Sequence, residues 1–316
     1  MSTTTEEQVA AEVNVKGEEL DIEAEENEQD APSKQKYTLG KEWGVESEFQ
    51  SDRGYTLARR TALPEEEASV GIVLVHGMGE HCGRYKHVAE ALTGAGYAVF
   101  SSDLKGHGKS EGKRLYIYDF MDFVRDVVQL TKIAKEEQPQ IQKWFLVGHS
   151  MGSLISVHTC LTHPDLFAGV VLSAPPLFVK VPPGAGIAAS IIGTLSASAQ
   201  LDPLDISTLC KDPKVVEEYL KDDLVSSGKP YARFLSQLIK HVPKARKAAP
   251  KFKTPYLLMH GTADTMCLPQ GSQKFHATTV IDDKTLKIFE GNYHELFNEP
   301  DIDATQELLN WVGARV

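Results

Sequence analysis

The chain has 316 residues, 41% of them hydrophobic and 24% charged, a composition that excludes a membrane-embedded or wholly disordered protein and allows a large buried core. Its formal net charge of −11 is concentrated in residues 1–36, which hold eleven acidic residues and three lysines, whereas the other 33 acidic and 30 basic residues nearly balance. The balanced part gives no argument for nucleic-acid binding, which needs a concentrated basic face.

Residues 1–36 contain no aromatic residue and too little apolar surface to repay ordering, so we predict a disordered acidic tail. The chain does not open with a basic stretch followed by an apolar core, and no apolar run approaches the ~18 residues of a membrane helix. We therefore expect a cytoplasmic protein. Its four cysteines are widely spaced and fit reduced thiols better than a disulfide framework or a metal site.

From residue 45 onwards, short β-rich runs alternate with longer helical runs, which predicts an α/β fold around a mostly parallel sheet. The turn-forming triplet Asp52-Arg53-Gly54 makes the first two strands a hairpin. Apolar residues at helical spacing predict crossover helices over 85–92, 117–136 and 150–161. The expected strands cover 45–51, 55–61, 70–75, 96–102, 143–147, 169–173, 254–260 and 284–290.

The alternation stops between residues 176 and 250, where two proline pairs precede an apolar run over 184–199 and a charged helical stretch over 214–220. We interpret 176–250 as an inserted helical cap, or lid, over the carboxyl ends of the strands, where open α/β sheets bind ligands. The core of the fold is then built from residues 37–175 and 251–316. The apolar run either lines a channel and touches a membrane surface or is a helix buried against the core.

The pentapeptide Gly148-His149-Ser150-Met151-Gly152 directly follows a predicted strand and opens a predicted helix. A serine between two such glycines, at a strand-to-helix turn, is typical of a nucleophile elbow, because only glycines let the neighbouring chain pass so closely. The pattern by itself also fits an ordinary loop serine. The strand before it and the helix after it favour the catalytic interpretation, with Ser150 as nucleophile.

A nucleophilic serine needs a base and an acid that orients the base, and in this fold they follow the serine in the order acid, then histidine. Asp264 lies just after a predicted strand, although an aspartate there could also cap the next helix. Only His276 and His294 come later; His294 follows the last strand, whereas His276 lies within a predicted helix and is interpreted as a surface or structural residue. Less well placed acids are Asp282, Asp283 and Glu290.

Acyl transfer also needs two backbone N–H donors for the oxyanion. Met151, directly after the nucleophile, supplies one. The strand over 70–75 runs into His76-Gly77-Met78-Gly79, whose glycines allow a turn that presents the N–H of Met78. Without the elbow, those glycines would indicate only a tight turn.

Patterns for cofactor binding fail on inspection. The stretch Gly108-Lys109-Ser110 lacks the first glycine of a phosphate-binding loop, since Asp103 stands in its place. The glycines at 184 and 186 follow two prolines instead of a strand, so they do not fit a dinucleotide fingerprint. We expect no cofactor and no metal.

With these motifs in hand, the sequence from about residue 40 to its end resembles the monoacylglycerol lipase and lysophospholipase family of serine hydrolases, which have the α/β-hydrolase fold. The resemblance implies that Ser150, Asp264 and His294 form a catalytic triad and that Met78 and Met151 form the oxyanion hole. Cys267 matches a position where some members carry a reactive thiol, while Ser153 replaces a glycine common in relatives. The motifs that carry the resemblance are the elbow, 76–81, 103–112, 260–264 and 293–295.

The resemblance predicts hydrolysis of the ester of a lipid with one acyl chain, with a monoacylglycerol as the leading substrate. Peripheral membrane contact through the cap is one interpretation of the apolar run over 184–199, beside a helix buried against the core. The same triad also serves a lysophospholipase, a broad small-ester esterase or an acyltransferase. A ligand-binding protein that kept the fold is the non-enzyme alternative. Such a protein would usually have lost a member of the triad, and here all three positions are filled.

Overall fold

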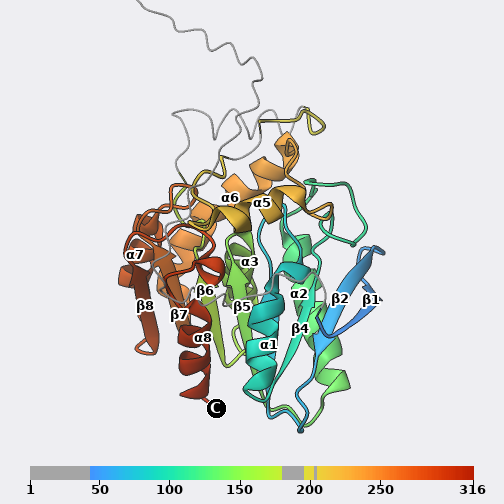
Figure 1. Cartoon of the computed structure of the whole chain (residues 1–316), viewed down its shortest axis with the longest axis vertical. Coiled ribbons are helices and arrows are strands. Elements are labelled where there is room, and N and C mark those ends of the chain that lie inside the picture. The colour runs from blue at the N-terminus through green and yellow to red at the C-terminus, as the bar shows by residue number, and fades with distance from the viewer. Residues whose placement is uncertain (1–42, 180–195, 203–204) are drawn as a thin grey trace, which may run out of the picture. The chain divides into compact units, whose positions relative to one another are not determined.

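An eight-stranded sheet forms the centre of the protein (Figure 1), in a computed structural model that describes residues 43–179, 196–202 and 205–316. The strand order is β1-β2-β4-β3-β5-β6-β7-β8, in which β1, β2 and β4 pair antiparallel and all other neighbours pair parallel. This arrangement confirms the α/β-hydrolase fold and the predicted hairpin. The strands are β1 (Val45–Gln50), β2 (Thr56–Ala62), β3 (Val70–Val75), β4 (Tyr97–Ser102), β5 (Lys143–His149), β6 (Gly169–Ser173), β7 (Tyr256–Gly261) and β8 (Lys284–Phe289).

Helices cover both faces of the sheet, with α1 and α8 on one face and α2 and α3 on the other (Figure 1). Side chains of β3 alternate between the two layers: Ile72 and Leu74 pack with α1 and α8, while Val73 and Val75 pack with α2 and α3. Burial on both faces explains why the central strands are almost continuously apolar. The helices are α1 (Lys86–Gly94), α2 (Met121–Glu137), α3 (Met151–Thr162), α5 (Pro213–Lys221), α6 (Ala232–Ala248), α7 (Pro269–Thr278) and α8 (Ala304–Gly313), with short 3₁₀ turns at 82–85, 249–251 and 296–298.

The expected elements are present with small shifts of their ends. The largest shift is at α2, which begins at Met121 instead of residue 117. The side chain of Asp119 accepts the N–H of Met121, so the chain turns there before the helix starts. In the sheet, β7 begins at Tyr256, two residues after the expected start.

Between β6 and β7, the described residues form α5 and α6, which lie across the carboxyl ends of the strands (Figure 1). Helix α6 contains Pro243, which cannot donate the usual hydrogen bond to the preceding turn. The domain boundaries expected from the sequence stay predictions. The predicted tail and most of the apolar run over 184–199 lie outside the described residues. Within the described part of the chain, every helix is too short or too polar to cross a membrane.

Candidate active site

Ser150 lies at the turn between β5 and α3 with φ 50° and ψ −119°, a conformation that non-glycine residues rarely adopt. Its N–H donates to the carbonyl of Ser173 at the end of β6, which helps to hold the turn in place. Such strain persists only where the surroundings enforce it, and it is typical of functional sites. The turn therefore has the backbone geometry expected of a nucleophile elbow.

The glycines of the elbow are required by close approach to the neighbouring chain. A Cβ added at Gly152 would come within 2.1 Å of the carbonyl oxygen of Val75, and one at Gly148 within 2.6 Å of the backbone of Gly152. Ser153 is also accommodated, because its buried hydroxyl donates to the carbonyls of Gly148 and Ser173 at 2.7 and 3.0 Å. The serine at this position thus adds hydrogen bonds within the elbow.

Asp264 and His294 come from the loops after β7 and β8, and their side chains meet at 2.7 Å between Oδ2 and Nδ1. The other oxygen of Asp264 accepts the N–H groups of Met266 and Cys267, both at 2.9 Å, which fixes the carboxylate. Both side chains are buried. By contrast, His276 bonds the hydroxyl of Tyr256 and does not line either of the cavities at Ser150.

Mutual attraction sets the charges of this pair. Burial opposes the charge of Asp264, but His294, His260 and the Cys267 N–H outweigh it and hold the pKa of the carboxyl well below its ordinary value. Burial likewise opposes protonation of His294, yet Asp264 and, to a smaller extent, Glu295 and Glu80 raise its pKa. The imidazole is thus oriented by a carboxylate that stabilises its protonated form.

Met78 and Met151 line the same cavity as Ser150. Met151 is the first residue of α3, where the N–H has no partner within the helix. Within the described residues, neither N–H donates to a protein acceptor. The N–H of Met151 therefore lies unpaired among the described residues at the positive end of the α3 dipole.

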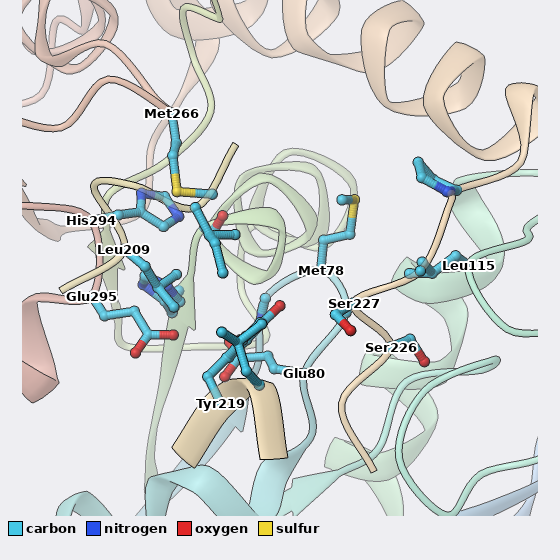
Figure 2. Close-up of a pocket in the computed structure, with 18 residues that line it drawn as sticks. Met78, Glu80, Leu115, Leu209, Tyr219, Ser226, Ser227, Met266, His294 and Glu295 are labelled. Atoms are coloured by element: carbon cyan, nitrogen blue, oxygen red, sulfur yellow. The ribbon is translucent and has the colours of Figure 1, made fainter. Parts of the chain in front are cut away.

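Two cavities meet at Ser150 and share Met78, Met266 and His294. The larger one, about 580 Å³, is apolar and extends below α6, where its walls include Leu235, Leu238, Ile239 and Val242. The smaller one, about 280 Å³, has a mixed lining, in which apolar side chains such as Leu115 and Leu209 lie beside the polar side chains Glu80, Tyr219, Ser226, Ser227 and Glu295 (Figure 2). The site therefore has an apolar side and a more polar side, with the serine between them, and the smaller cavity is called the polar cavity for these five polar side chains.

A buried ionic cluster forms one wall of the smaller cavity. Arg84 donates to Glu80 at 2.8 Å and binds both oxygens of Glu295, at 2.5 and 2.8 Å. Glu80 also accepts the N–H of Gly77 and the hydroxyl of Tyr85, at 2.6 and 2.7 Å. Although burial works against its charge, Arg84 and two nearby histidines lower the pKa of Glu80 to about 2. The cluster links the loop after β3 to the loop that carries His294.

Sequence reasoning did not identify this cluster, although Glu80 and Glu295 each lie within a motif that it had singled out. The spacing of the two residues gives no hint that one arginine joins them.

Cys267 lies against the Ser150 hydroxyl, and burial and Asp264 raise the pKa of its thiol well above the ordinary value. The side chains of Cys267, Asp264 and His294 also place three potential metal-ligand atoms within 4.8 Å of one another. The carboxylate of Asp264 and the Nδ1 of His294 already form a hydrogen bond with each other.

The parallel sheet, the strained serine turn and the Asp264–His294 pair define the class of the protein as an α/β-hydrolase. Residues 66–301 match the family model of the serine aminopeptidase S33 hydrolases. The chain belongs to this family of serine hydrolases.

Among similar proteins with curated names are monoglyceride lipases. Human monoglyceride lipase is 37% identical over 251 residues, which cover 77% of this chain and 82% of the human protein. The monoacylglycerol lipase of Mycolicibacterium smegmatis is 33% identical over 270 residues, covering 84% of this chain and 96% of that protein.

Solved structures give the same grouping. The crystal structure of Paleococcus ferrophilus monoacylglycerol lipase aligns with a TM-score of 0.73 at 33% identity, covering 82% of this chain and 99% of that one. A soluble variant of monoglyceride lipase from Saccharomyces cerevisiae, in complex with a substrate analog, aligns with a TM-score of 0.79 over 90% of this chain and 99% of that one. At 20% identity, the latter likeness shows the fold alone.

Proposed function

We propose that the protein hydrolyses the ester bond of a monoacylglycerol, with Ser150, His294 and Asp264 as its catalytic triad. The observation that carries the proposal is that an apolar cavity and a more polar cavity meet at Ser150. A monoacylglycerol has the same division, since its ester joins one acyl chain to a polar alcohol. The names of the similar lipases agree with this substrate.

In the proposed mechanism, Ser150 Oγ attacks the ester carbonyl while His294 Nε2 takes its proton. The backbone N–H groups of Met78 and Met151 hold the oxyanion, and Asp264 stabilises the imidazolium. The C–O bond to glycerol then breaks, and His294 returns the proton to the leaving oxygen. Water, activated by His294 in the same way, attacks the acyl-enzyme and releases the fatty acid. No metal or organic cofactor takes part.

The test replaces the nucleophile. Ser150→Ala is expected to abolish both monoacylglycerol hydrolysis and labelling by a fluorophosphonate probe, because both require the serine oxygen. The matched control is Ser156→Ala, six residues further along the chain within α3, whose hydroxyl bonds the Gly152 carbonyl. Full hydrolysis by Ser150→Ala would refute the assignment.

A separate experiment distinguishes a hydrolase from an acyltransferase. The wild type is assayed with added glycerol or an alcohol, and the fraction of the acyl group that goes to these acceptors instead of water is measured.

We also infer that residues 176–250 form a cap that contacts lipid surfaces. No acidic residue occurs between 224 and 263, although eight lysines and arginines do. Lys240, Lys244 and Lys247 are exposed at spacings that place them on one side of α6, and none pairs with a described carboxylate. Each lysine near an anionic membrane contributes about 1 kcal/mol of binding.

At the apolar cavity, Phe178 and Val179 add partly exposed hydrophobic surface. Flotation with phosphatidylcholine vesicles, with and without phosphatidylglycerol, measures the contact. Lys244→Glu with Lys247→Glu is expected to weaken binding to the anionic vesicles, whereas Lys132→Glu with Lys274→Glu, away from the cap, is expected to change it little. Equal binding by all three proteins would contradict the inference.

A further inference from the structure

Among the described residues, the polar cavity beside Ser150 is lined by two carboxylates and by no lysine or arginine. Glu80 and Glu295 are among its 18 lining residues, and Figure 2 shows both side chains beside Tyr219. Its remaining polar groups are hydroxyls, imidazoles and backbone. The described wall of the cavity that receives the alcohol of the substrate therefore offers no fixed positive charge from a lysine or arginine.

Arg84 is a cation next to this cavity, but both of its terminal nitrogens already donate to the two glutamates. One terminal nitrogen is shared by Glu80 and Glu295, and the other donates to Glu295. The ring of Tyr219 lies 4.8 Å from the guanidinium carbon, and the arginine side chain is only 9% exposed. Arg84 therefore neutralises one of the two glutamates and leaves the cluster with a net charge of −1.

Glycerol and a phosphate ester make opposite demands on such a cavity. Each free hydroxyl of glycerol can donate a hydrogen bond to a carboxylate oxygen. A phosphate has mainly acceptor oxygens and carries up to two negative charges near neutral pH, so it would face acceptors of the same charge. Burial strengthens this repulsion, because partly desolvated charges are weakly screened.

We propose that Glu80 and Glu295, with Arg84 held between them, select lipids with an uncharged headgroup and reject those with an anionic one. The inference rests on the proposed hydrolysis of monoacylglycerols and names Glu295 as a determinant of specificity. It separates monoacylglycerols from lysophospholipids with acidic headgroups, two substrate classes that the triad alone does not distinguish.

The experiment compares two substrates that differ by one phosphate, a 1-acylglycerol and the 1-acylglycerol 3-phosphate with the same chain. Both are presented in nonionic detergent micelles, so that binding to a charged surface does not enter. One uncompensated charge at about 6 Å, with an effective dielectric constant of about 20, corresponds to roughly 100-fold in kcat/KM. The wild type is expected to prefer the acylglycerol by at least this factor.

Two changes to the cavity test the role of charge independently. Glu295→Gln keeps an acceptor for Arg84 but removes one negative charge, and it is expected to reduce the preference at least tenfold. Ser227→Lys adds a cation to an exposed position of the cavity wall and is expected to reduce the preference as well, without touching the buried cluster. Ser227→Gln controls for side-chain size, and Glu90→Gln, on the exposed side of α1, controls for total charge.

The outcomes are distinct. Equal turnover of both substrates by the wild type would overturn the inference and leave the proposed function intact. A preference that neither Glu295→Gln nor Ser227→Lys reduces would also overturn it, even if Glu295→Gln were poorly folded, since Ser227→Lys remains informative. Failure to hydrolyse the acylglycerol at all would refute the proposed function itself, and the inference with it.

Discussion

Replacing Asp264 with asparagine removes the charge that supports His294 while keeping the shape of the side chain. The two groups meet at 2.7 Å between Oδ2 and Nδ1, in a buried site. Opposite charges about 4 Å apart attract by about 4 kcal/mol at an effective dielectric constant of about 20. Because the imidazolium forms only as the serine reacts, losing this attraction is expected to lower kcat by about three orders of magnitude.

The same substitution is expected to change the pH profile in a definite direction. His294 must be neutral to take the serine proton, so kcat/KM rises with pH through the pKa of His294. In the wild type, Asp264 raises that pKa above its ordinary value, despite the opposing effect of burial. In Asp264→Asn, burial acts without the carboxylate, and the acidic limb is expected to move to lower pH while the plateau falls.

The assay is ester hydrolysis between pH 5 and 9, with active sites counted by fluorophosphonate labelling. Asp282→Asn is the matched control, because Asp282 lies exposed before β8 and is expected to be silent. An Asp264→Asn enzyme with more than a tenth of wild-type kcat, or an acidic limb that moves to higher pH, would refute the electrostatic reasoning. So would an equal loss of activity in Asp282→Asn.

Two further substitutions and one chemical modification test other parts of the site. Arg84→Met leaves two buried glutamates without their cation and is expected to cost about 3–5 kcal/mol of stability, visible in thermal unfolding; an unchanged Tm would contradict the role given to the cluster. Leu238→Trp partly fills the apolar cavity and is expected to lower kcat/KM for C16–C18 acyl chains at least tenfold while sparing butyryl esters; a uniform loss across chain lengths would argue against acyl binding there. Cys267 is expected to resist iodoacetamide at pH 7.5 until the protein is unfolded, because burial and Asp264 raise the pKa of its thiol, and rapid alkylation of the native protein would disprove this.

Local signals were sufficient to predict the sheet. Each central strand is a short apolar run bounded by turn residues. The strands β3 and β5 were placed correctly because these runs are too short and too continuously apolar to fit an amphipathic helix. The start of α2 was misplaced because apolar spacing continues through residues 117–120, while the turn there depends on the hydrogen bond that the N–H of Met121 donates to the side chain of Asp119. Strand order was not predicted, since pairing joins segments far apart in the sequence.

The proposed site was predicted only in part, because some of its contacts also join residues far apart in the sequence. Ser150, Asp264 and His294 each follow a strand, so the rule that strand ends meet at one edge brings them together. The Glu80–Arg84–Glu295 cluster depends on a contact across 211 positions, for which the sequence offers no periodic or positional signal. The division of the space around Ser150 was also beyond prediction, because it arises from side chains of α6 and of the loops that precede it.

The acyl-enzyme intermediate of the proposed reaction fixes the order in which the products leave, and the two cavities that meet at Ser150 place each product on a different side of the serine. Glycerol departs from the polar side while the acyl group is still bonded to the serine, and the fatty acid leaves last from the apolar side. Such an order corresponds to ping-pong kinetics. Fatty acid should then inhibit in competition with the substrate, whereas glycerol should return the acyl group to the alcohol and slow net hydrolysis without blocking entry of the chain.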